Sequence, residues 1–149
     1  MQFKAFSEKQ RQVLTWWCDG AGTRDREAII CDGAVRSGKT LCMGLSFFCW
    51  AMRRFGGEKF ALCGKTVSAL RRNLLSTLLP ALGELGFRYQ ETVSQNRVRV
   101  RFGGQENTFY LFGGRDEGSA GLIQGMTLAG VLLDLSLIHI SEPTRRTPI

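Results

Sequence analysis

The chain has 149 residues, 44% of them hydrophobic and 22% charged, which suits one domain of ordinary size with a real core. It contains no run of about 18 apolar residues, which excludes a transmembrane helix, and its first residues lack the apolar segment of a signal peptide. The net charge of +7 favours polyanionic partners.

Cysteine usage argues against a zinc site, because the chain has no C-x-x-C pair and a single histidine, His139. An odd number of cysteines inside apolar segments predicts reduced, buried thiols in a cytoplasmic setting. These cysteines are Cys18, Cys31, Cys42, Cys49 and Cys63.

The first predicted element is a helix from Ser7 through Trp17. Ser7 and Gln10 have the spacing of a capping box, in which each side chain bonds the other residue's backbone N–H. The polar, glycine-bearing residues 19–26 predict a loop after this helix.

Residues 33–40 read Gly-Ala-Val-Arg-Ser-Gly-Lys-Thr and match the phosphate-loop pattern G-x-x-x-x-G-K-[ST] at every fixed position. The apolar residues 27–31 before it predict a buried strand, and residues 41–54 after it predict a helix. Strand, glycine-rich turn and helix are the context in which this pattern binds a nucleoside triphosphate.

Each position of this loop has a chemical reason. Gly33 and Gly38 let the backbone approach the phosphates closely. The N–H groups of the loop and the positive N-terminus of the helix then attract the phosphate oxygens. Lys39 can reach the β- and γ-phosphates, and the Thr40 hydroxyl can ligate Mg²⁺. The predicted nucleotide-binding residues are Gly33, Ala34, Val35, Arg36, Ser37, Gly38, Lys39 and Thr40.

Two residues near the nucleotide have alternative interpretations. Arg36 could contact the γ-phosphate or sense a neighbouring subunit, or it could form a salt bridge that shapes the loop. Gln10 could hydrogen-bond the adenine edge, while its capping role explains it without any nucleotide.

Further elements follow in order. Residues 59–63 predict a strand, and residues 67–83 predict a helix in which Pro80 introduces a kink or an end. A β-hairpin is predicted from residues 87–92 and 97–102 around a turn at residues 94–96. Residues 108–112 and 129–134 predict two more strands, so we expect an α/β fold with a hairpin excursion.

The arginines of these elements are candidate DNA contacts. Arg97, Arg99 and Arg101 share one strand face and could track DNA phosphates, although a solvated strand face explains them as well. Arg71 and Arg72 near the start of a helix could contact DNA, and a solvated helix face competes equally.

The apolar residues 129–133 end in Asp134, which is the second nucleotide element of a phosphate-loop ATPase. We expect Asp134 to lie near Thr40 and to hold Mg²⁺ with it. In the subclass with an extra catalytic acid, the next residue is Glu. Position 135 is Leu, which cannot orient a water molecule, so we expect this chain to be deficient in hydrolysis.

Together, the phosphate loop 33–40, the opening residues 6–10 and the residues 114–134 that lead to Asp134 resemble phage terminase large subunits, in the PBSX-type group of defective prophages of Gram-positive bacteria. The resemblance implies an ATPase of the RecA/ASCE-like P-loop class with a mostly parallel sheet and flanking helices, incomplete at the C-terminus. It implies ATP and Mg²⁺ as cofactors, with Lys39 and Arg36 in catalytic roles.

As a partner the resemblance implies double-stranded DNA, which such motors drive into a procapsid in the bacterial host cytoplasm. It also implies the small terminase subunit, the portal protein and a homo-oligomeric ring. The family's C-terminal nuclease has no counterpart in the sequence, and we expect residues 1–134 to be the N-terminal part of the ATPase domain.

Residues 135–149 resemble the translation of a sequencing-library adapter, so we expect a non-native tail rather than a genuine extension. Two alternative functions remain open at this point. One is a non-hydrolysing nucleotide-binding module or prophage remnant, which Leu135 favours if the tail is genuine. The other is a fragment of a helicase-like ATPase.

Overall fold

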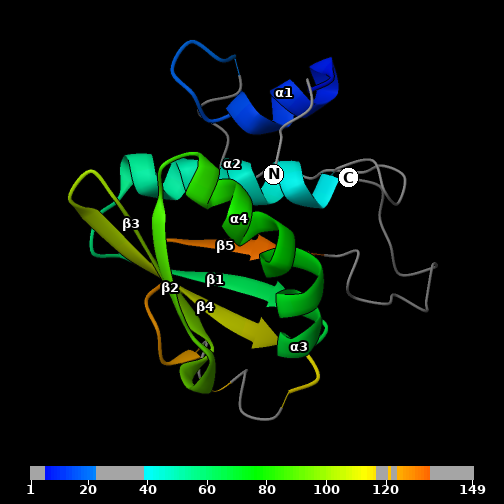
Figure 1. The fold of residues 1–149 in the computed structure, drawn as a ribbon, viewed down its shortest axis with the longest axis vertical. Helices are drawn as coiled ribbons and strands as arrows, with labels where there is room; N and C mark the ends of the chain where they lie inside the picture. The colour runs from blue at the N-terminus through cyan, green and yellow to red at the C-terminus, as the bar shows by residue number, and fades with distance from the viewer. Residues whose placement is uncertain (1–5, 23–38, 117–120, 122–123, 135–149) are drawn as a thin grey trace.

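The computed structural model describes residues 6–22, 39–116, 121 and 124–134. Its helices and strands alternate along much of the chain, and no described helix is long and apolar enough to cross a membrane (Figure 1). The elements are α1 (Glu8–Thr15), α2 (Lys39–Arg54), β1 (Lys59–Gly64), α3 (Val67–Leu70), the π-helical turn η1 (Arg71–Leu75), α4 (Ser76–Glu84), β2 (Arg88–Thr92), the 3₁₀ turn η2 (Val93–Gln95), β3 (Arg97–Phe102), β4 (Gln105–Gly113) and β5 (Gly130–Leu133).

The five described strands form one mixed sheet in the order β2-β3-β4-β1-β5. β1 pairs in parallel with both β4 and β5, whereas β3 pairs antiparallel with β2 and β4. The α/β class with a hairpin excursion is therefore confirmed. Among the described strands, parallel and antiparallel pairings are equally frequent, because the hairpin continues directly into β4.

Helices cover one face of this sheet and form the core with it (Figure 1). Phe48 of α2 stacks on Phe109 of β4 with ring centroids 4.1 Å apart, and Phe109 stacks on Phe60 of β1 at 5.0 Å. All three side chains are fully buried. Alternation along each strand places the other side chains on the opposite face. There Val131 and Leu133 of β5 are 47% and 51% exposed.

The predicted capping box is confirmed at the start of α1. The Ser7 N–H donates to Gln10 Oε1 at 2.9 Å, and the Gln10 N–H donates to Ser7 Oγ at 3.2 Å. The helix ends at Thr15 rather than at Trp17. Trp17 is buried, and Arg54 of α2 lies over its ring at 5.9 Å and donates to its carbonyl.

The predicted helix 67–83 is continuous but not uniform. Thr66 caps α3, whose last residue leads into the π-helical turn η1, and α4 then continues past Pro80 to Glu84. Of the two outcomes predicted for Pro80, an end of the helix is wrong, because Pro80 lies inside α4. The helix packs tightly on α2, since a Cβ added to Gly44 would lie 3.0 Å from Leu78.

The hairpin β2–β3 is confirmed, with Asn96 in the left-handed conformation at its turn. The sequence interpretation missed that β3 also turns directly into β4 through Gly103 and Gly104, both at positive φ, and that β4 begins at Gln105. Such a glycine pair favours a two-residue hairpin turn. The predicted strand at 27–31 and the tail 135–149 lie outside the described residues.

Candidate nucleotide-binding site

The carboxyl ends of the three parallel strands meet at one edge of the sheet. Gly64 of β1 is level with Gly113 of β4, and Cys63 is level with Leu133 of β5. The Asp134 N–H donates to the Cys63 carbonyl at 3.0 Å, which fixes the backbone of Asp134 directly beyond β5. The side chain of Asp134 is buried, with 6% exposed.

The N-terminus of α2 lies at this same edge. In Figure 1, α2 runs from its cyan end at Lys39 against the direction of the strand arrows, so it begins where β1, β4 and β5 end. Its first turn contains no acidic residue. The positive end of a helix macrodipole beside the carboxyl ends of parallel strands is a favourable place for an anion such as a phosphate group.

Thr40 and Asp134 come to the same level along this edge. A Cβ added to Gly130 would lie 2.7 Å from the Trp50 ring, so Gly130 and Trp50 are in register across the interface. Thr40 precedes Trp50 by about 15 Å of helix, and Asp134 follows Gly130 by about 13 Å of strand. Because α2 and β5 run in opposite directions, going back along α2 to Thr40 and forward along β5 to Asp134 leads to the same edge of the sheet.

A magnesium ion fits this arrangement without a dedicated protein cage. Among the described residues, no group of three His, Cys, Asp or Glu side chains could hold a metal ion. Mg²⁺ commonly takes one or two protein oxygens and completes its shell with nucleotide phosphates and water. The hydroxyl of Thr40 and the carboxylate of Asp134 are oxygen donors of that kind. The neighbouring Cys63 offers no thiolate at neutral pH, because burial raises the pKa of its thiol.

The same edge contains two residues that the sequence interpretation did not single out. Asp116 Oδ2 accepts a 2.8 Å hydrogen bond from the Val67 N–H and so fixes the start of α3 to the end of β4. Gly113 must lack a side chain, since a Cβ there would lie 2.6 Å from the Thr66 Cα. An Asp three residues after a strand carries no distinctive pattern, and only the strand pairing brings it to α3.

The predicted site residues are placed as follows. Thr40, Asp134 and the backbone of Lys39 lie at the strand edge, whereas Gln10 lies on α1 and is engaged in its capping box. The phosphate-loop residues Gly33, Ala34, Val35, Arg36, Ser37 and Gly38 lie outside the described residues, as does Leu135.

The predicted DNA contacts separate into two groups. Arg97, Arg99 and Arg101 alternate along β3 and share the face that α2 and α4 leave uncovered. Arg72 is exposed on η1. Arg71 is engaged within the chain: its Nε donates to Glu91 Oε2 at 2.9 Å, and its terminal nitrogen donates to the Val93 carbonyl and to Asn96 Oδ1 at 2.9 and 2.7 Å.

Arg71 therefore joins the helix that follows the strand edge to the hairpin turn. We expect Arg71→Ala to lower the free energy of unfolding by about 2 kcal/mol, because it leaves a half-buried carboxylate and two acceptors without their charged donor. Urea unfolding followed by circular dichroism measures this loss. Arg72→Ala is the matched control, with an expected change within about 0.5 kcal/mol. Equal effects of the two substitutions would contradict a joining role for Arg71.

Several solved structures of one protein are similar to the chain. The large terminase from a thermophilic bacteriophage matches with a TM-score of 0.87 and 45% sequence identity over 89% of this chain. The same terminase in complex with ADP matches at 0.83 and 44% over 88%, and in complex with ATP-γ-S at 0.82 and 42% over 92%. The chain spans about a third of the length of that terminase, with 33%, 32% and 33% covered. No protein-family model and no curated protein matches the chain.

Proposed function

Since the chain is homologous to part of the large terminase subunit of a bacteriophage, we propose that residues 1–134 are the ATP-binding part of a viral DNA-packaging motor. The observation that carries this proposal is the match, above 40% identity, to a terminase crystallised with ADP and with ATP-γ-S. The proposal is also supported by the position of Thr40, Asp134 and the start of α2 at one edge of the sheet. A nucleotide bound at that edge would contact both Thr40 and Asp134.

In this proposal the chain is a P-loop ATPase of the RecA/ASCE-like class. Lys39 neutralises charge on the β- and γ-phosphates, and Arg36 assists at the γ-phosphate. Thr40 and Asp134 would hold Mg²⁺, which would neutralise charge on the phosphates. Gln10 reaches the adenine edge in addition to capping α1.

The partner of the complete motor is double-stranded DNA, with the small terminase subunit and the portal protein, in a ring of subunits in the host cytoplasm. Because Leu135 stands where an ATPase of this class has a catalytic Glu, the chain with this sequence binds ATP and hydrolyses it poorly. The second candidate, a non-hydrolysing nucleotide-binding module, makes the same binding prediction and differs in having no DNA partner.

Asp134→Asn tests the metal-binding part of the proposal. We expect the affinity for a fluorescent ATP analogue in Mg²⁺ to fall by at least about tenfold, equivalent to about 1.4 kcal/mol, because the neutral amide attracts the cation less than a carboxylate. In EDTA the variant and the parent chain should bind the analogue equally. If the variant and the parent chain bound the analogue equally both in Mg²⁺ and in EDTA, the proposed role of Asp134 in holding the metal would be wrong. No binding by the parent chain would contradict the proposed function itself.

A further inference from the structure

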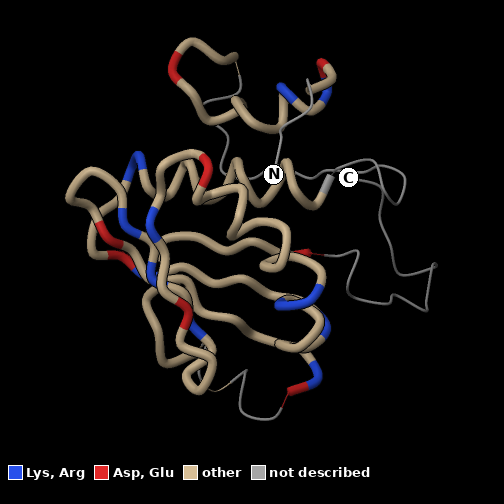
Figure 2. Tube along the Cα trace, viewed as in Figure 1, with Lys and Arg blue, Asp and Glu red and all other residues tan. Residues whose placement is uncertain are grey.

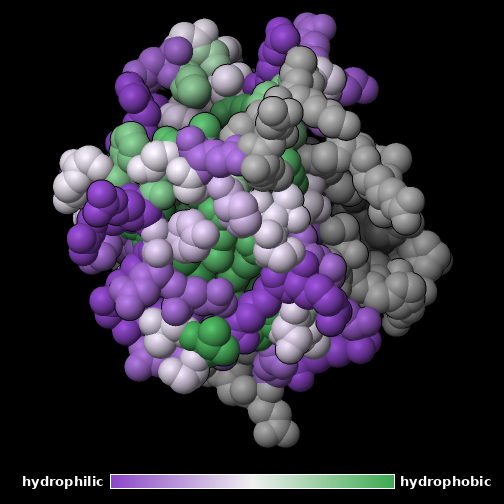
Figure 3. Space-filling view, in the orientation of Figure 1, coloured by the Kyte–Doolittle hydropathy of each residue, from purple (hydrophilic) through white to green (hydrophobic). Residues whose placement is uncertain are grey.

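The hairpin face opposite the helices carries an uncommon pairing of like charges. Arg88 of β2 lies directly across from Arg101 of β3, and Gln90 lies across from Arg99. Cross-strand like charges destabilise a sheet unless an anion lies between them. Across the other ladder, Arg101 faces Glu106 of β4. Figure 2 shows basic positions on these strands with acidic positions between them, and Figure 3 shows hydrophilic residues around the apolar middle of the face in view.

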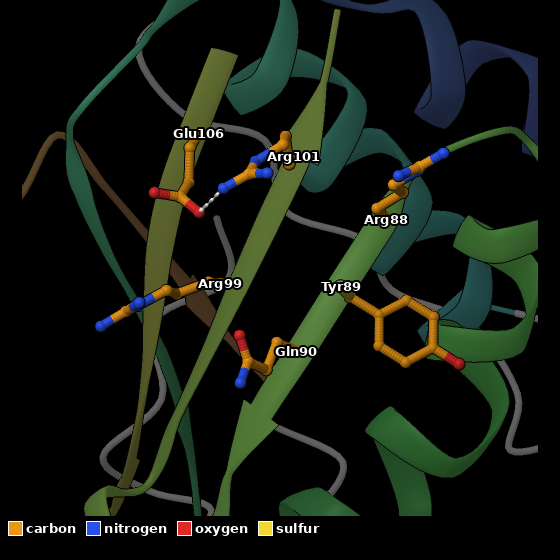
Figure 4. Close-up of a pocket in the computed structure, with 6 residues that line it drawn as sticks. All are labelled: Arg88, Tyr89, Gln90, Arg99, Arg101 and Glu106. Atoms are coloured by element: carbon orange, nitrogen blue, oxygen red, sulfur yellow. Dashed lines mark hydrogen bonds and ion pairs between the residues drawn. The ribbon is translucent and has the colours of Figure 1, made fainter. Parts of the chain in front are cut away.

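These side chains surround a shallow hollow of about 170 Å³, which we call the arginine cradle (Figure 4). Its members are Arg88, Tyr89, Gln90, Arg99, Arg101 and Glu106, although the ring of Tyr89 points toward the helices. Glu106 is its one acidic member and pairs with Arg101 at 3.2 Å, with 63% of the Arg101 side chain and 43% of the Glu106 side chain exposed. Arg88 and Arg99 have no acidic partner among the described residues. Three guanidinium groups against one carboxylate leave a net charge of +2.

We propose that the arginine cradle binds the phosphate backbone of double-stranded DNA. This inference rests on the proposed function and adds the place where DNA is held. The cradle is open and lies across three strands, so it suits a continuous polyanion better than a small enclosed ligand. Arg99 and Arg101 are separated by about 6.8 Å along β3, which is also the axial rise of two steps on a DNA strand.

The cradle is separate from the nucleotide edge. Glu106 lies near the start of β4 and Gly113 at its end, so about 23 Å of strand lies between the two sites. Arg71 does not bridge them, because the β2–β3 turn that it bonds lies at the Gly113 end of β4, where Arg97 pairs with Tyr110. DNA binding at the cradle therefore does not require a bound nucleotide, and each can be measured without the other.

The test uses the 149-residue chain and a fluorescent 30-base-pair duplex of arbitrary sequence. Each phosphate contact steepens the slope of log affinity against log salt concentration by about 0.9. At 0.1 M salt, one such contact therefore raises the affinity roughly eightfold. We expect Arg88→Ala and Arg99→Ala each to weaken binding by roughly that factor and to reduce the slope by about one. Glu106→Gln should tighten binding severalfold, because it removes the cradle's carboxylate and frees Arg101.

Arg53→Ala is the matched control, since Arg53 is an exposed arginine at the end of α2, outside the cradle. It removes the same charge and should change the affinity by less than about twofold. Circular dichroism melting checks that each variant is folded, and Arg99→Lys should retain most of the binding. The proposal is overturned if Arg53→Ala weakens binding as much as Arg99→Ala, or if Glu106→Gln leaves the affinity unchanged. Binding of the fluorescent ATP analogue should be equal in all cradle variants, which separates this inference from the nucleotide-binding proposal.

Discussion

Asn107→Ala is expected to lower the free energy of unfolding by about 3–4 kcal/mol and the melting temperature by about 10 °C. Asn107 lies within β4 with only 1% of its surface exposed. Its Nδ2 donates to the Phe55 and Ala51 carbonyls at 2.9 and 3.3 Å, and its Oδ1 accepts from the Glu58 N–H at 2.9 Å. Truncation removes this partner from the Phe55 carbonyl and from the Glu58 N–H, while the Ala51 carbonyl keeps its bond from the Phe55 N–H. Loss of such a buried hydrogen-bond network is among the more costly effects of a single substitution.

The role of the amide can be separated from that of its volume. Asn107→Asp keeps the shape and replaces the Nδ2 donor by an oxygen that faces two carbonyls at the C-terminal end of α2. A negative charge there is further disfavoured by the helix macrodipole. We therefore expect Asn107→Asp to be at least as destabilising as Asn107→Ala at pH 7. Differential scanning calorimetry gives both values.

Asn73→Ala provides a matched control for this series, because Asn73 is exposed on η1. Its expected change is within about 0.5 kcal/mol. If Asn107→Ala were equally mild, the amide would not be what holds the end of α2 to β4.

Lys39→Ala is expected to have the largest effect on ligand binding. Lys39 occupies the lysine position of the phosphate-loop pattern and begins α2 at the edge where β1, β4 and β5 end. Removing a charged partner from a desolvated phosphate commonly costs about 2–5 kcal/mol, so we expect the affinity for the ATP analogue to fall by roughly 30-fold or more. Isothermal titration calorimetry with ATP-γ-S measures the loss.

Unlike Asp134→Asn, the Lys39 variant should lose affinity in EDTA as well as in Mg²⁺, because the contact proposed for Lys39 is with the phosphates themselves. Lys65→Ala serves as the control, since Lys65 directly follows β1 near the same edge and carries the same charge. A loss of comparable size in Lys65→Ala would mean that general positive charge, rather than the loop lysine, holds the nucleotide.

Much of this architecture could be predicted from local patterns. The capping box at Ser7, the alternating residues of β3 and the strand β5 each depend on neighbours in the sequence, and each is confirmed. Val131 and Leu133 of β5 are exposed, however, where a buried strand was predicted. The phosphate loop itself stays a prediction, because its residues lie outside the described part. The π-helical turn η1 was not predicted, since no residue pattern distinguishes it from the α-helix around it.

The residues that the sequence interpretation missed depend on contacts between distant segments. Asp116 reaches Val67 across 49 positions, and Asn107 reaches Ala51 across 56. Arg88 is different, because the predicted hairpin already implied that it pairs with Arg101. The register was available from the sequence, and it would have extended the strand face of Arg97, Arg99 and Arg101 to a second strand.

The order of strands also has a consequence for how the chain folds. β2, β3 and β4 form a continuous antiparallel unit whose partners are close in sequence, such as Phe102 and Gln105. The parallel ladders join Lys59 to Thr108 and Phe60 to Gly130, which are 49 and 70 positions apart. Loops of that length close slowly compared with hairpins, which form in about 1–10 μs. The hairpin can thus assemble early on the folding pathway, while the nucleotide edge forms only when β1 completes the sheet.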